Sequence, residues 1–168
     1  MRHSVQTFAE WLAATPLSEL IKNVEWIIPA VQTIHILAIA LVMSAVFVVD
    51  LNALGILVRT QPLAGVAHRF LPWIWWMVLV LLVSGGILII GEPERSLTNP
   101  AFIAKMAMLC VVLSLTLGFQ RGLRRDGQFW QSSLGRRVGG RVLAVISLAL
   151  WIGILVSGRW IAYYVDAV

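Results

Sequence analysis

Four long apolar stretches, separated by short polar segments, dominate the pattern along this chain. They cover residues of about 24–49, 70–90, 101–119 and 142–165, and each approaches the ~20 residues that an α-helix needs to cross a bilayer. Backbone groups in lipid must form hydrogen bonds within their own segment, so each stretch is expected to be helical. The predicted fold is all-α: a polytopic membrane protein whose four transmembrane helices form an antiparallel bundle over residues 24–168.

The first 23 residues have a different pattern, in which apolar positions such as Phe8 and Trp11 alternate with polar ones such as Glu10 and Glu19. This alternation predicts an amphipathic interfacial segment made of two short helices that lie on the membrane surface.

Proline residues predict where several helices begin. The pairs Thr15-Pro16, Gln61-Pro62 and Asn99-Pro100 each place a proline in a helix's first turn, where its missing N–H costs nothing. Pro29, inside the first apolar stretch, is expected to kink that helix.

The composition excludes most other classes of protein. Hydrophobic residues make up 60% of the 168 residues and charged residues only 12%, against about 25% charged in soluble domains. The single cysteine, Cys110, excludes an intrachain disulfide. The sequence contains no P-loop, GxSxG, HExxH or CxxC motif, so we do not expect an enzyme that acts alone.

The basic residues predict the orientation in the membrane. The net charge is +5, and attraction to anionic lipid explains it without a nucleic-acid partner. The loops after the first and third stretches carry eight of the 13 basic residues: Arg59, Arg69, Arg121, Arg124, Arg125, Arg136, Arg137 and Arg141. Arg2, Lys22, Arg95 and Arg159 belong to the other side. The positive-inside rule then predicts a bacterial inner-membrane protein with cytoplasmic basic loops, the second at 120–141, and both termini periplasmic.

Polar residues inside the apolar stretches are the candidate site. Folding the chain into hairpins places His35 at the depth of Gly85, Gly86 and Lys105, with Arg159 somewhat further out. We take these five as candidate cofactor-binding residues in the outer half of the bundle, because intramembrane ionisable groups by default indicate function.

Candidate metal ligands are His35, Met106 and Cys110, since imidazole and soft sulfur suit copper or a haem axial position. Structural interpretations remain open for all of these residues. His35 can be a hydrogen-bonded core residue, the glycine pair a helix contact and Met106 and Cys110 gap-fillers. Lys105 can extend to the outer interface rather than neutralise a bound anion.

A second polar cluster is expected near the cytoplasmic end, where Asp50, Asn52, His68 and Arg69 have similar depth. An ion pair of Asp50 with Arg69 or His68 would form a structural clasp, and a proton relay or gate is the alternative. His35 and His68 differ in depth by ~25 Å, so they cannot ligate one haem within one chain. A bis-histidine haem therefore requires a second subunit.

Four segments resemble a family of small bacterial four-span membrane proteins of unassigned function, itself distantly similar to the copper-resistance D membrane proteins. They are residues 32–38 (QTIHILA), residues 69–70 (RF) leading into 80–85 (VLLVSG), residues 102–109 (FIAKMAML) and residues 157–163 (SGRWIAY). The resemblance implies copper handling or membrane redox chemistry, with His35 and Lys105 as the matching positions.

Three functional hypotheses follow. The first is a membrane protein that binds a metal or redox cofactor, copper or haem b, in the outer half of the bundle. The second is an accessory or structural subunit of a larger membrane complex, and the third is a small transporter gated by the Asp50 cluster. The expected partners are the lipid bilayer and either further copies of the chain or another membrane subunit.

Overall fold

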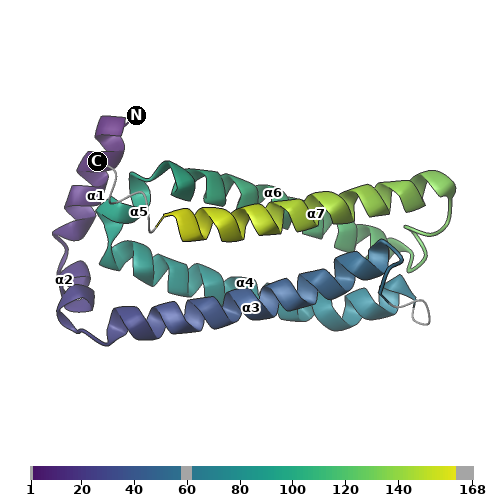
Figure 1. Ribbon diagram of the computed structural model, residues 1–168, viewed down its shortest axis with the longest axis horizontal. Coiled ribbons are helices and arrows are strands. Elements are labelled where there is room, and N and C mark those ends of the chain that lie inside the picture. The colour runs from purple at the N-terminus through teal and green to yellow at the C-terminus, as the bar shows by residue number, and fades with distance from the viewer. Residues whose placement is uncertain (1, 58–61, 162–168) are drawn as a thin grey trace.

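Four long helices form the body of the protein. The computed structural model describes residues 2–57 and 62–161. Helices α3 (Ile27–Ala53), α4 (Leu63–Gly91), α6 (Pro100–Arg125) and α7 (Leu134–Trp160) are each long and apolar enough to cross a membrane. They run side by side along the long axis of the molecule (Figure 1), which confirms the all-α, four-span prediction.

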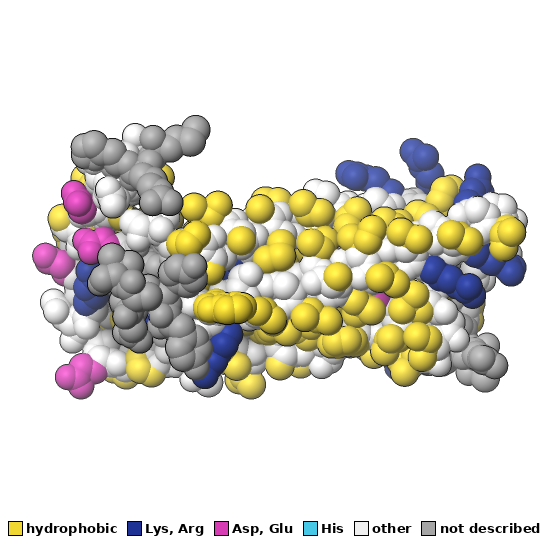
Figure 2. Space-filling model, turned by 45° about the horizontal axis from the view of Figure 1, so that its top comes forward, with side chains coloured by type: hydrophobic (Ala, Val, Ile, Leu, Met, Phe, Trp, Pro, Cys, Tyr) yellow, Lys and Arg dark blue, Asp and Glu magenta, His cyan; other side chains and the backbone are white. Residues whose placement is uncertain are grey.

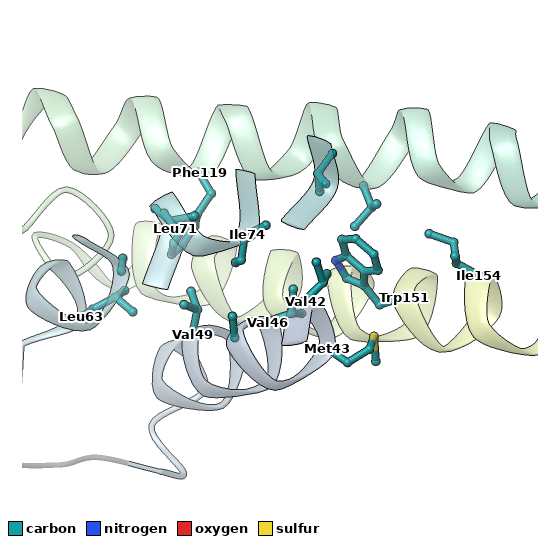
Figure 3. Packing of buried hydrophobic residues seen from close by; sticks show 14 residues of the cluster. Val42, Met43, Val46, Val49, Leu63, Leu71, Ile74, Phe119, Trp151 and Ile154 are labelled. Carbon is teal, nitrogen blue, oxygen red and sulfur yellow. The ribbon is translucent and has the colours of Figure 1, made fainter. Parts of the chain in front are cut away.

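The four helices pack as two hairpins. Helix α3 packs along α4 and α6 along α7, the two pairs meet mainly where α3 contacts α7, and α4 has few contacts with α6. The buried core between the hairpins includes Val42 of α3 and Trp151 of α7 (Figure 3). Outside this core the helices expose large apolar side chains, as lipid-facing surfaces do.

The helices extend beyond the apolar stretches that predicted them, mostly at the basic end. Helix α4 begins at Leu63, directly after Pro62, and Gln61 lies outside the described residues. Helix α7 begins at Leu134 and α6 continues to Arg125, so most of 120–141 is helical and the prediction of a loop there was wrong. Hydrophobicity marks the part of a helix in lipid, whereas arginine favours helix on either side of that boundary.

Proline and asparagine act at the helix starts. Asn99 caps α6, because its Oδ1 accepts a hydrogen bond from the Ala101 N–H at 2.9 Å. Pro29 is the third residue of α3, where the backbone N–H has no intrahelical partner to lose. Pro29 therefore removes no hydrogen bond from α3, and the physical reason for expecting a kink there does not apply.

Three short helices cover the end opposite the basic loops (Figure 1). Helices α1 (Arg2–Ala13) and α2 (Pro16–Asn23) confirm the two predicted N-terminal helices. Helix α5 (Pro93–Leu97) was not predicted, and it packs against α1. Thr15 caps α2 by accepting a hydrogen bond from the Ser18 N–H at 3.4 Å.

At the basic end an aromatic cluster supports the turn between α6 and α7. The Trp130 ring stacks on Phe119 at 5.5 Å, and its Nε1–H donates to the Phe119 carbonyl at 3.2 Å. Gly122 lies directly beneath: a Cβ there would be 3.0 Å from both Phe129 Cδ1 and Trp130 Nε1. The Arg136 guanidinium lies 4.4 Å from the centre of the Phe129 ring.

Charge is divided between the two ends of the bundle (Figure 2). Most basic side chains gather where α6 and α7 are joined, while acidic side chains lie at the end that carries α1, α2 and α5. Arg59 lies outside the described residues. The exposed arginines of the basic end are Arg69, Arg121, Arg124, Arg125, Arg136, Arg137 and Arg141.

Candidate functional site

A hydrogen bond between α3 and α4 defines the first candidate site. Nδ1 of the half-buried His35 lies 2.7 Å from Oγ of Ser84, and Ser84 is buried. The Ser84 hydroxyl also donates to the Val80 carbonyl at 2.6 Å. A serine hydroxyl carries one hydrogen, so both contacts are hydrogen bonds only when Nδ1–H of His35 donates to Ser84.

This hydrogen-bond arrangement determines which ring nitrogen of His35 carries the proton and which can bind a ligand. With the proton of the neutral ring on Nδ1, Nε2 carries the lone pair that can ligate a metal or accept a hydrogen bond. Metal-bound histidines in proteins have the same arrangement, in which the second ring nitrogen donates to an oxygen that orients the ring.

Small residues lie beside the imidazole of His35 and beside the ammonium of Lys105. A Cβ on Gly85 would lie 3.5 Å from Cε1 of His35, so α4 approaches the ring closely, as the hairpin register predicts. A Cβ on Gly86 would meet nothing within 4 Å. The ammonium of Lys105 lies 3.9 Å from the corresponding point on Gly158 of α7, and its charge acts on His35.

Lys105 has no counter-charge among residues 2–57 and 62–161. Its Nζ forms no ion pair and no hydrogen bond with any residue in the described ranges, although the side chain is half-buried. The half of the bundle opposite the basic end therefore contains an imidazole lone pair and a primary ammonium. His35 of α3 lies beside Ser84 of α4, and Lys105 of α6 lies beside Gly158 of α7. Together, the imidazole and the ammonium can hold a ligand that carries a metal or a hydrogen-bond donor and also a negative charge.

The remaining predicted residues do not complete a metal centre. Met106 is half-buried, while Cys110 and Arg159 are exposed. Within residues 2–57 and 62–161, no group of three or more His, Cys, Asp and Glu side chains is placed to hold a metal ion. His35 is thus the residue on which a metal hypothesis depends.

The second predicted cluster does not form as expected. Asp50 and Asn52 are buried, whereas His68 and Arg69 point outward and are exposed. Among the described residues the one ion pair joins Arg95 to Glu92, so the predicted clasp of Asp50 with Arg69 or His68 was wrong. His68 and Arg69 are exposed on α4 instead of turning toward the buried Asp50.

Asp50 instead faces a small, partly open cavity. The cavity measures about 30 Å³ and its lining includes Asp50, Thr116 of α6 and Ser147 of α7. The Ser147 side chain hydrogen-bonds the carboxyl group, while Oδ2 of Asp50 has no partner among the described residues.

Three polar residues of these sites were missed in the sequence. Ser84, Thr116 and Ser147 look like ordinary small residues of apolar stretches, where serine and threonine often bond to their own backbone. One signal was available for Ser84, because it adjoins the glycine pair at the depth of His35. No comparable signal identified Thr116 or Ser147.

Comparison with known proteins bears on the resemblance found in the sequence. No curated protein and no solved structure matches the chain, and no link to the copper-resistance D membrane proteins is shown. A family model does match, over residues 8–164, which includes all four membrane helices. The chain therefore belongs to the family of unknown function DUF6644.

Proposed function

We propose that this integral membrane protein binds a metal or metal-containing redox cofactor, copper or haem b, through Nε2 of His35. The observation that carries the proposal is the chain of hydrogen bonds from His35 through Ser84 to the Val80 carbonyl. Because Nδ1 of His35 is bonded to Ser84, the Nε2 lone pair points away from Ser84. A metal ligand needs such an oriented, neutral imidazole.

Lys105 is the second component of the proposed site. An ammonium without a counter-ion is costly inside a membrane, and a bound anionic group offsets that cost. A haem propionate is one such group, and an anion that accompanies copper is another. The chain supplies one histidine at this depth, so a second axial protein ligand would come from another copy of the chain or from a partner subunit.

The proposed orientation follows from the distribution of charge. The exposed arginines at the end that joins α6 to α7 would face the cytoplasm of a bacterium, and α1, α2 and α5 would lie at the periplasmic surface. The His35 site would then open toward the periplasm.

Elemental analysis of protein purified in mild detergent tests the proposal. We expect about one iron or copper per one or two chains, with an optical spectrum that distinguishes haem from copper. His35→Ala should lose the metal, and His35→Asn should lose it too, because the amide replaces the Nδ1 donor but not the imidazole ligand. His68→Ala removes an exposed histidine and is the matched control.

Retention of the full metal content by a folded, monodisperse His35→Ala protein would contradict the proposal. Neither iron nor copper in the folded wild-type protein would also contradict it. That second result would favour an accessory subunit of a larger complex, for which α6 offers the least buried of the four membrane helices.

A further inference from the structure

The cavity beside Asp50 lies among all four membrane helices, in the half of the bundle nearer the basic end. Its apolar walls include Val46, Leu71, Ile74 and Phe119, which belong to the buried core drawn in Figure 3. The volume is about 30 Å³, and cavities of about 10–15 Å³ already hold one water molecule. There is room for one small ion and no room for an organic ligand.

Asp50 brings an unbalanced carboxylate to this cavity. Its side chain is about nine-tenths buried, at 9% relative exposure, and Oδ2 has no hydrogen-bond partner within the described ranges. Among the described residues, the cavity lining contains no Lys, Arg or His. Removing a carboxylate from water costs several kcal/mol unless an opposite charge or further hydrogen bonds compensate, so the cavity favours a cation.

The other polar atoms of the cavity are hydroxyl oxygens that can complete the coordination. Thr116 donates its hydroxyl hydrogen to the Val112 carbonyl at 2.8 Å, which leaves the lone pairs of Oγ1 available as donors to a cation. Ser147 Oγ lies at the Asp50 carboxyl. A set of three hard oxygen donors without sulfur or nitrogen selects hard cations over copper or iron.

We infer that Asp50, Thr116 and Ser147 form a binding site for one small monovalent cation, with Na⁺ as the probe. The lining contains a single acidic residue, so a monovalent ion balances the charge. The site is independent of His35, because Asp50 lies 15 residues further along α3, or about 22 Å.

Binding of radiolabelled sodium to the purified protein tests this inference, with choline replacing sodium at constant ionic strength. The wild-type protein should bind sodium saturably, at about one ion per chain. Asp50→Asn should abolish binding, and Thr116→Val and Ser147→Ala should each weaken it about tenfold or more, since each removes one of three donors. Asp126→Asn, at an exposed aspartate of the same end, should bind like the wild type.

Three outcomes would overturn the inference: no saturable binding by the folded wild-type protein, unchanged binding by Asp50→Asn, or an infrared signal of a protonated Asp50 that sodium does not displace. The last result would make the bound species a proton. If Asp50→Asn does not fold, Thr116→Val and Ser147→Ala carry the test. His35→Ala should bind sodium normally, so the outcome is separable from that of the metal proposal.

Discussion

The Ser84 hydroxyl accepts one hydrogen bond and donates another, and this places a single polar residue between two helices at the depth of His35. The depth could be predicted from the sequence, because a short turn fixes which positions of a hairpin lie opposite each other. The hydrogen-bond partner of His35 could not be predicted in this way. Membrane helices are apolar on every side, so no hydrophobic stripe shows which face of the helix points inward.

We predict that Ser84→Ala weakens metal binding at His35 by about 10–100-fold, the usual effect of removing the group that orients a ligating histidine. The metal affinity of the purified variant, measured by competition with a chelator, checks this. Ser114→Ala is the matched control, because Ser114 also donates to the carbonyl four residues earlier, at 2.8 Å, but lies exposed on α6. Equal affinities of the Ser84→Ala and wild-type proteins would show that Ser84 does not position the ligand.

The wrong prediction of an ion pair at Asp50 has the same physical cause as the failure to identify Ser84 from the sequence. The sequence pattern predicts Asp50 and Arg69 at one depth, but in the structure Asp50 is buried and Arg69 is exposed. The hydroxyls that do line the Asp50 cavity come from α6 and α7. Contacts between two hairpins depend on how each hairpin rotates about its axis, and the apolar pattern carries no information on that rotation.

At the scale of elements, the number and order of the membrane helices follow from the four apolar stretches, and their ends do not. Helices α6 and α7 continue past the apolar stretches until the short connection of residues 126–133. This connection is held by the aromatic cluster of Phe119, Phe129 and Trp130 rather than by glycine or proline. Gly122 is essential there because the rings occupy the space that any larger side chain would need.

We predict that Gly122→Ala destabilises the folded protein by about 1–3 kcal/mol, the typical cost of overpacking, since its methyl group would press on Phe129 and Trp130. Gly118→Ala, one turn earlier on the same helix, meets nothing within 4 Å and should be neutral or slightly stabilising, because alanine favours helix over glycine.

Denaturant unfolding in detergent micelles, followed by tryptophan fluorescence, compares the free energies of unfolding of the two variants. Similar stabilities would mean that the aromatic cluster does not support the turn between α6 and α7.

At the scale of the whole molecule, charge separates the two ends of the bundle (Figure 2), and the positive-inside rule assigns the basic end to the cytoplasm. Topology is tested in a Cys110→Ser background, with one cysteine introduced at each end. We expect a membrane-impermeant maleimide to label Ser96→Cys in spheroplasts and to label Ser132→Cys only after the membrane is opened. The reverse pattern would invert the proposed orientation and place the His35 site on the cytoplasmic side.

The division into two hairpins has a consequence for how the protein is made. Each candidate site is shared: the first hairpin supplies His35 and Asp50, and the second supplies Lys105, Thr116 and Ser147. The Asp50 cavity in particular is incomplete while the hairpins are still apart in the membrane, because Thr116 and Ser147 belong to the second hairpin. Ion binding there and docking of the hairpins are therefore one linked equilibrium. A bound ion would shift that equilibrium toward the assembled bundle. Without the ion, an unassembled chain would expose Asp50 to lipid. Membrane quality control can recognise a chain by such an exposed residue.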